Sequence, residues 1–171
     1  MTPLAAEAGR ANIFLNWNLI WGPIMEAVKL TCTTCGQANR IPRDRLAQGP
    51  KCGSCGEPLA NGRVHELDQL SHDKAVRGDE LPLLVDYWAP WCGPCRAMAP
   101  EFAKAAGALA PAVRFAKLNT QDHPEIAGRA RIQGIPALVL YHRGREIARL
   151  AGARPAAQIA DFVRQNLAGR G

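Results

Sequence analysis

Apolar residues in the second part of the chain alternate between the spacings of strands and of helices. The segment LLVDYW at 83–88 is almost continuously apolar, which is typical of a central strand buried on both faces. After residue 92, apolar side chains recur every three or four positions as far as Leu109 and predict a helix. Strands are also predicted over 64–67, 113–118, 137–142 and 145–150, and helices over 68–77, over 123–131 and from Pro155 onward. Alternating strands and helices followed by a hairpin predict an α/β fold over residues 63–171, with helices on both faces of a central mixed sheet.

The first part of the chain lacks this regularity. Residues 29–62 are rich in Gly, Pro, Cys and Arg and show neither helical nor strand periodicity of useful length. Such a segment buries too little apolar surface to fold alone, so a metal ion or disulfides must hold it. Residues 1–28 are interpreted as a weakly structured tail, and Met25 is a candidate for the true translational start. The alternative for the apolar stretch at 13–24 is a membrane-associating anchor, although it lacks the basic flank that such anchors use.

Charge and hydropathy restrict the partners of the chain. The formal net charge of +6 is spread along the sequence, without the block of five or six basic residues that marks a nucleic-acid-binding tail. Residues 29–62 contain no Phe, Tyr or Trp, which also disfavours nucleic-acid binding. No run of 18 or more apolar residues occurs, so we expect no membrane span. The length of 171 residues suffices for one domain and a small module, and we expect a monomer.

The six cysteines form three Cys-x-x-Cys pairs, namely Cys32/Cys35, Cys52/Cys55 and Cys92/Cys95. Disulfide scaffolds of secreted proteins rarely pair all their cysteines at this short spacing. In a cytoplasmic protein the pattern indicates metal binding or redox catalysis. We therefore predict a cytoplasmic location.

The third pair lies in WAPWCGPC at 88–95, directly after the buried strand and at the start of a helix. The unpaired N–H groups and partial positive charge of a helix N-terminus favour a thiolate at Cys92. Cys95 lies one turn deeper, where it can attack a mixed disulfide at Cys92 and release the partner. The motif predicts dithiol–disulfide exchange, with Cys92 as the accessible nucleophile and a redox-active Cys92–Cys95 disulfide.

Residues 63–171 resemble thioredoxin throughout. The resemblance rests on LVDYWAPWCGPC at 84–95, FAKLN at 115–119, GIPA at 134–137 and a glycine at 152 before the last helix. It implies a thioredoxin fold and an activity on disulfide-containing protein substrates. One departure is Ala137, where many members of the family have Thr.

The resemblance also implies roles for single residues. Asp86 matches a buried carboxylate that acts as general base toward Cys95, and Lys117 matches a residue that helps to set its ionisation. Pro136 matches a cis-proline that faces the dithiol and lets a substrate strand pair with the adjacent backbone. The implied substrate contacts are Trp91, Gly93, Pro94, Ile135 and Pro136, and Trp88 matches a second tryptophan that flanks the site.

The first two cysteine pairs have the spacing of a zinc site. Sixteen residues separate the pairs, and a glycine that permits a sharp turn follows each of them. Four protein ligands leave no open position, so one structural Zn²⁺ per chain is predicted on Cys32, Cys35, Cys52 and Cys55. Two disulfides or four free thiols are the alternatives. Residues 30–62, including NRIP at 39–42, resemble the zinc ribbon that precedes the redox domain in zinc-containing thioredoxins of bacteria.

Two functions fit this organisation. The first is a protein disulfide reductase, recycled by an NADPH-dependent thioredoxin reductase as the resemblance implies. Gly93 and Pro94 between the cysteines favour it, because members that oxidise or isomerise disulfides usually carry a histidine there. The second is a zinc-ribbon binding or holdase module in which the dithiol serves as a redox switch.

Overall fold

The computed structural model describes residues 27–168, so most of the predicted tail and the candidate start at Met25 lie outside the described residues. From residue 64 onward, every predicted strand and helix is present, and its bounds lie within two residues of the predicted ones. The elements are β3 (Val64–Leu67), α2 (Gln69–Gly78), β4 (Leu83–Trp88), α3 (Gly93–Leu109), β5 (Arg114–Asn119), α4 (Pro124–Arg129), β6 (Ala137–His142), β7 (Arg145–Ala151) and α5 (Ala156–Leu167).

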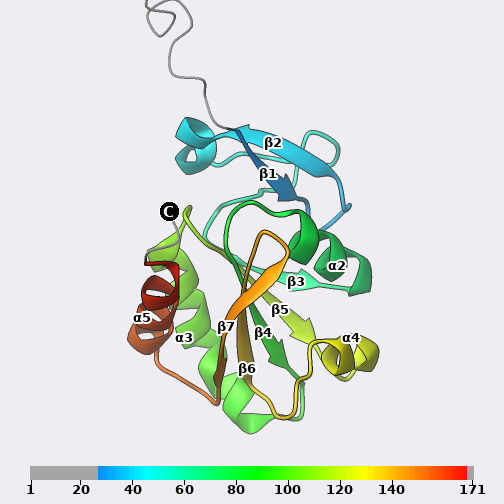
Figure 1. Ribbon diagram of the computed structural model, residues 1–171, viewed down its shortest axis with the longest axis vertical. Helices are drawn as coiled ribbons and strands as arrows, with labels where there is room; N and C mark the ends of the chain where they lie inside the picture. The colour runs from blue at the N-terminus through cyan, green and yellow to red at the C-terminus, as the bar shows by residue number, and fades with distance from the viewer. Residues whose placement is uncertain (1–26, 169–171) are drawn as a thin grey trace, which may run out of the picture.

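Five strands form one mixed sheet in the order β3-β5-β4-β6-β7 (Figure 1). β3, β5 and β4 run parallel, whereas β6 and β7 are each antiparallel to the preceding strand in that order. Helices α3 and α5 pack on one face, and α2 and α4 pack on the other. The predicted α/β class and mixed central sheet are confirmed. Among the described residues, no helix combines the length and apolar character that crossing a membrane requires.

The alternation of side chains along β4 decides which residues lie below α3. Neighbouring residues of a strand point to opposite faces of the sheet. Leu84 packs with Phe102 and Phe115 on the α3 face, where the two Phe ring centroids are 4.9 Å apart. Val85 packs on the α2 face. By the same alternation, Asp86 points to the α3 face, where the helix that carries the redox cysteines lies.

The segment before residue 63 contains regular secondary structure that its sequence periodicity did not indicate. β1 (Ala27–Thr31) and β2 (Ala38–Pro42) form an antiparallel pair, and the 3-10 helix η1 (Arg43–Gln48) follows. Strands of five residues are too short for their alternation to stand out in a Gly- and Pro-rich sequence. The first strand begins at Ala27, two residues before the predicted start of the module.

This ribbon packs on the end of the sheet at which β4 begins. The N–H of Thr31 donates to Asp79 Oδ1 over 2.7 Å, and Asp79 also forms a buried ion pair with Arg114. Two hydrogen bonds of 2.7 and 2.9 Å join Lys29 and Glu80. The other end of β4, about 17 Å away at 3.3 Å per residue, leads to the redox motif. The ribbon and the start of α3, where the redox cysteines lie, are therefore at opposite ends of the sheet (Figure 1).

Candidate functional site

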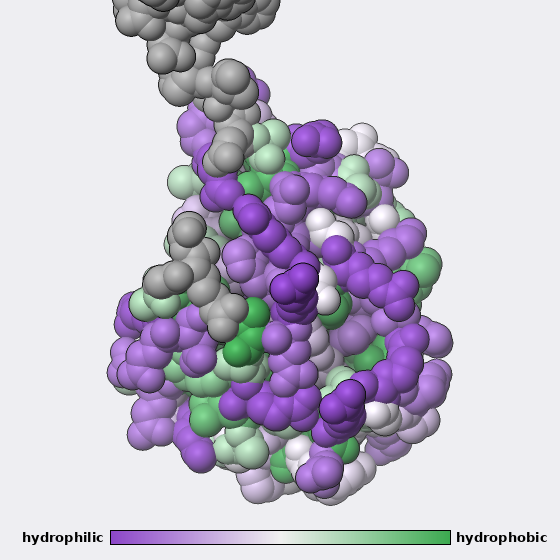
Figure 2. Space-filling view, viewed as in Figure 1, coloured by the Kyte–Doolittle hydropathy of each residue, from purple (hydrophilic) through white to green (hydrophobic). Residues whose placement is uncertain are grey.

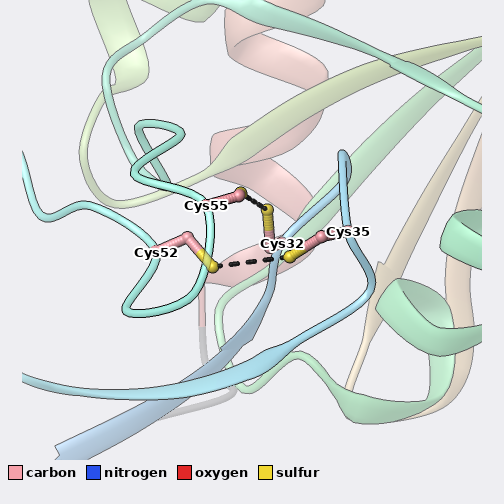
Figure 3. A group of neighbouring side chains, drawn as sticks. All are labelled: Cys32, Cys35, Cys52 and Cys55. Atoms are coloured by element: carbon pink, nitrogen blue, oxygen red, sulfur yellow. Dashed lines mark hydrogen bonds between the residues drawn. The ribbon is translucent and has the colours of Figure 1, made fainter.

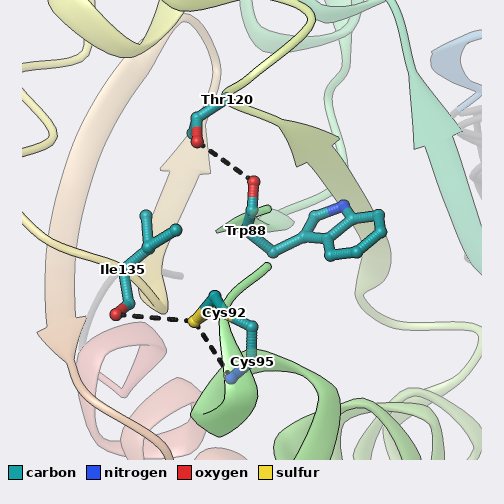
Figure 4. The surroundings of a disulfide bond; sticks show 5 residues. All are labelled: Trp88, Cys92, Cys95, Thr120 and Ile135. Atoms are coloured by element: carbon teal, nitrogen blue, oxygen red, sulfur yellow. Dashed lines mark hydrogen bonds between the residues drawn. A yellow bond between two sulfur atoms is a disulfide. The ribbon is translucent and has the colours of Figure 1, made fainter. Parts of the chain in front are cut away.

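Cys92 and Cys95 form a disulfide at the N-terminus of α3 (Figure 4). Cys92 is the N-cap residue, with an extended backbone, and its Sγ accepts a hydrogen bond of 3.2 Å from the Cys95 N–H. Pro94 occupies the first turn, where a missing N–H removes no helical hydrogen bond. The helix start thus directs a backbone donor at Cys92 Sγ, as the sequence predicts. The same donor stabilises a thiolate on Cys92 when the disulfide is reduced.

The solvent exposure of the two cysteines differs less than the sequence predicts. Cys92 is 4% exposed and Cys95 is 2% exposed in this disulfide form. Cys92 Sγ is bonded to Cys95 Sγ and lies 3.9 Å from the Ile135 carbonyl oxygen. These two neighbours shield the sulfur from solvent on two sides. Trp91, in contrast, is 70% exposed next to Cys92. The expected accessibility of Cys92 is therefore not seen in the oxidised chain.

The loop before β6 supplies the opposite wall of the site. The Ile135–Pro136 peptide bond is cis, as predicted, and the Pro136 carbonyl accepts a hydrogen bond of 2.9 Å from Gly152 N–H. An open groove of about 490 Å³ runs beside this loop. Its lining comes from residues 131–137 and 149–152. Ile135 lines the groove, and its carbonyl oxygen is the atom that lies 3.9 Å from Cys92 Sγ.

Asp86 is a buried carboxyl without a hydrogen-bond partner for Oδ1 among the described residues. It is 4% exposed. Burial raises the pKa of Asp86 to about 7, and the positive charge of Lys117 opposes this rise. A carboxyl with this pKa can take up and release a proton near neutral pH. The burial predicted for Asp86 is confirmed.

Lys117 is the register partner of Asp86 on β5, so the structure brings the two predicted residues together. Its Nζ lies 4.8 Å from the centroid of the Trp88 ring and 3.5 Å from Glu66 Oε2. No motif in the sequence points to Glu66. Its place in a predicted strand was visible, but its partner on β5 depends on a pairing register that periodicity does not specify.

The end of β4 that leads into the redox loop is held in place by the residue that follows β5. The Trp88 carbonyl accepts hydrogen bonds from Thr120 N–H at 2.8 Å and from Thr120 Oγ1 at 3.1 Å (Figure 4). Cys92 N–H in turn donates to the Ala89 carbonyl over 3.1 Å. These bonds fix the short connection between the buried strand and the helix that carries the disulfide.

The four remaining cysteines converge on one point in the ribbon (Figure 3). All four sulfur atoms lie within 4.8 Å of one another. The Cys32 and Cys55 sulfurs are 3.5 Å apart, and those of Cys35 and Cys52 are 3.6 Å apart. Sulfurs bound at about 2.3 Å around a tetrahedral Zn²⁺ are separated by roughly 3.8 Å. The arrangement therefore fits a four-cysteine zinc centre, and none of the four cysteines forms a disulfide.

The two cysteine loops have the same backbone structure. In the first, Cys32 N–H donates to the Gln37 carbonyl and Gly36 N–H donates to the Cys32 carbonyl. In the second, residues 52, 56 and 57 repeat both bonds. The glycine of each loop has a positive φ, of 71° in the first and 77° in the second, which a residue with a side chain rarely adopts. The repeat explains why both cysteine pairs are followed by glycine.

The electrostatics of the cluster favour a cation. Backbone N–H groups of Cys55 and Ser54 favour the thiolate of Cys52 and lower its pKa to about 6. At Cys55 the backbone N–H of Glu57 acts in the same direction, but the three neighbouring cysteine sulfurs and burial together outweigh it and raise the pKa of Cys55 to about 12. Four adjacent thiols cannot all ionise without a counter-charge. A divalent ion at their centre would supply it.

Known proteins resemble both parts of the chain. The family model described as Thioredoxin matches residues 63–165, and the model described as Thioredoxin 2, N-terminal, matches residues 31–57. Thioredoxin C-3 of Corynebacterium nephridii is 37% identical over 138 residues, which cover 81% of this chain and 94% of that protein. Thioredoxin of Alicyclobacillus acidocaldarius subsp. acidocaldarius is 43% identical over 101 residues, which cover 57% of this chain and 95% of that protein.

A solved structure agrees with the larger match. The crystal structure of chloroplastic thioredoxin z superposes with a TM-score of 0.58 and 31% identity, covering 63% of this chain and 96% of that one. The fold, the cysteine pair at the helix start and the four-cysteine ribbon agree with these matches. The chain therefore belongs to the thioredoxin family, in its zinc-containing thioredoxin 2 type, and is a thiol–disulfide oxidoreductase.

Proposed function

We propose that this chain reduces disulfides in protein substrates through Cys92 and Cys95 and is recycled by an NADPH-dependent thioredoxin reductase. The observation that carries the proposal is the Cys92–Cys95 disulfide at a helix N-terminus, with Ile135 and cis-Pro136 on one side and buried Asp86 on the α3 face of the sheet. The same pair can hold two electrons as a dithiol and give them up on closing the disulfide.

The reaction begins with the reduced chain. The Cys92 thiolate attacks one sulfur of the substrate disulfide, the substrate S–S bond breaks, and one substrate thiolate leaves and takes up a proton. Cys92 is then joined to the substrate by a mixed disulfide. Backbone groups of the groove beside Ile135 and Pro136 would align the substrate, with Trp91, Gly93 and Pro94 around the attacked sulfur.

The second step closes the disulfide. Cys95 gives its proton to Asp86 and attacks the Cys92 sulfur, and the second substrate thiolate leaves and is protonated. Asp86 then releases that proton to the leaving thiolate or to solvent, which also received the Cys92 proton when the thiolate formed. Counted from the dithiol, the chain has lost two electrons and two protons, and the substrate has gained both. The pKa of about 7 at Asp86 suits this transfer, and Lys117 next to it would help to set that value. Thioredoxin reductase would return two electrons from NADPH to the Cys92–Cys95 disulfide.

We further propose that one Zn²⁺ per chain is held by Cys32, Cys35, Cys52 and Cys55 in a structural role. When bound, the ion would join the two loops of the ribbon, because each loop supplies two of the four thiolates. Thiolate ligands require a reducing environment, so we place the protein in the cytoplasm. The zinc would take no part in the exchange reaction, since the ribbon lies at the opposite end of the sheet from Cys92.

The holdase alternative has less support. A holdase needs exposed apolar surface. The face shown in Figure 2 is mainly hydrophilic, with apolar residues in small separate patches. Among the described residues, Leu70 and Trp91 are the large apolar side chains that are well exposed.

A coupled assay tests the reductase proposal. NADPH oxidation is followed with thioredoxin reductase and insulin as the disulfide substrate, and metal content is measured on the same preparation. We expect turnover by the wild-type chain and none by Cys92→Ser. Failure of the wild-type chain to reduce insulin, in the presence of a reductase that is active with another thioredoxin, would reject the proposed function.

A further inference from the structure

Three charged residues form a row across neighbouring strands. Glu66 on β3 is the register partner of Lys117 on β5, and Asp86 on β4 is the partner of Lys117 on its other side. In a parallel sheet, register partners point to the same face. The three side chains therefore lie on the α3 face, with the cation between two carboxylates.

The contacts within this row are unequal. Lys117 Nζ is 3.5 Å from Glu66 Oε2, which counts as an ion pair. Asp86, in contrast, has an Oδ1 atom without a hydrogen-bond partner among the described residues. Lys117 Nζ also lies 4.8 Å from the centroid of the Trp88 ring, on the strand that carries Asp86. The cation thus pairs with the exposed carboxylate and not with the buried one.

We propose that Glu66 is a positioning residue for the reductase: its carboxylate holds the Lys117 ammonium at the sheet edge and so weakens the attraction of Lys117 for Asp86. The inference rests on the proposed function in so far as Asp86 is the base toward Cys95. Glu66 itself touches neither the disulfide nor the substrate groove. It keeps Asp86 able to hold a proton near neutral pH, which the closing step requires.

The other groups around Asp86 leave Lys117 as its main charged neighbour. On β6 the register partner of Asp86 is the apolar Leu138. The residues of α3 and α5 that pack on this face are apolar, as shown by Met98, Phe102, Ile159 and Val163. α3 also carries Arg96, which is exposed, and Glu101 and Lys104, which pair with each other, and the two redox cysteines lie at its start. These cysteines do not titrate while they form the disulfide, so the oxidised chain isolates the effect of Lys117 and Glu66.

The test is the titration of the Asp86 carboxyl by ¹³C NMR in the oxidised, zinc-loaded chain. In Glu66→Gln the opposing negative charge is lost, the charged form of Asp86 is stabilised, and its titration midpoint should fall by roughly 0.2–0.5 pH unit, the scale of a solvent-screened pair. Asp161→Asn is the matched control. Asp161 and Glu66 are both 62% exposed and 3.5 Å from a cation, but Asp161 lies on α5 and pairs with Arg164.

Two further variants test whether the effect passes through Lys117. Lys117→Gln should raise the Asp86 midpoint, and adding Glu66→Gln to it should shift the midpoint less than Glu66→Gln does alone. Glu66→Asp keeps the charge and should restore a midpoint close to that of the wild type. An unchanged midpoint in Glu66→Gln would overturn the inference. So would an equal shift with and without Lys117, because that would be direct repulsion between carboxylates.

The result of the titration does not depend on the result of the reductase assay. The NMR measurement needs no turnover, so a shifted Asp86 midpoint in a chain that does not reduce insulin would support the role of Glu66 and reject the proposed function. In an active chain, the acidic limb of the pH–rate profile should move to lower pH in Glu66→Gln and stay in place in Asp161→Asn.

Discussion

Replacing Asp86 by Asn removes a buried charge and should stabilise the chain more at high pH than at low pH. The pKa of Asp86 is about 7 in the folded chain, against an ordinary value of 3.8. A raised carboxyl pKa means that the folded chain binds the proton more tightly than the unfolded chain does. The cost of burying Asp86 is therefore absent below about pH 4, grows as pH rises through the interval between the two values, and is complete above pH 7.

The difference of about three pH units corresponds to a cost of about 4 kcal/mol at pH 8. At pH 5.5 the same relation gives a cost of about 2 kcal/mol for burying Asp86. The Asn amide adds a pH-independent cost of roughly 1–3 kcal/mol if its N–H groups lack acceptors. The gain in unfolding free energy for Asp86→Asn should thus be about 2 kcal/mol larger at pH 8 than at pH 5.5, whatever the amide costs.

Urea unfolding of the oxidised, zinc-loaded chains at the two pH values measures this difference. Asp161→Asn, an exposed carboxylate on α5, is the control and should change the unfolding free energy by about 0.5 kcal/mol or less at both values. The same Asp86→Asn chain should turn over more slowly near neutral pH, because Cys95 loses its base. An equal effect of Asp86→Asn on stability at both pH values would refute the raised pKa and the reasoning built on it.

Three other predictions concern the cysteines and the tail. Cys52→Ser should lower the zinc content from about one ion per chain and raise hydrogen exchange in residues 29–62, while reductase turnover persists; full zinc retention would contradict the ligand assignment. Cys95→Ser should trap substrates in disulfides that map to Cys92 by mass spectrometry and are released by a reductant, and Cys92→Ser should trap few. Adducts found mainly at Cys95 would reverse the proposed order of attack. Removal of residues 1–24 should leave the melting temperature and turnover nearly unchanged, and a loss of several kcal/mol of stability would show that this segment packs on the fold.

The local sequence was sufficient to predict the order of strands and helices in residues 63–171. The apolar run at 83–88, the helical spacing after Cys92 and the Arg143-Gly144 turn each depend on neighbours within a few residues. Both turn residues have positive φ values, of 49° and 79°, as a tight hairpin requires. The cysteine spacings are local features as well, because the geometry of a Cys-x-x-Cys loop is set by its own backbone.

Local patterns were insufficient for the ribbon. β1 and β2 have five residues each, and their apolar side chains pack partly against Leu81, which comes from the segment before β4. A strand whose burial depends on a residue some forty positions away shows little of that burial in its own pattern. The docking of Thr31 on Asp79 was hidden for the same reason.

The tertiary structure alone decided how the functional residues meet. From the sequence, Asp86 was expected to be buried, and Lys117 was placed near it only by resemblance to thioredoxin. The register of three parallel strands determines that Glu66, Lys117 and Asp86 form one row, and a shift of one residue would turn Lys117 to the other face. The exposure of Cys92 also depends on the loop at Ile135, far from it in the chain. Periodicity specifies which face of a strand is apolar. Pairing between distant strands specifies which charged residues are neighbours, and the proton affinity of Asp86 depends on those neighbours.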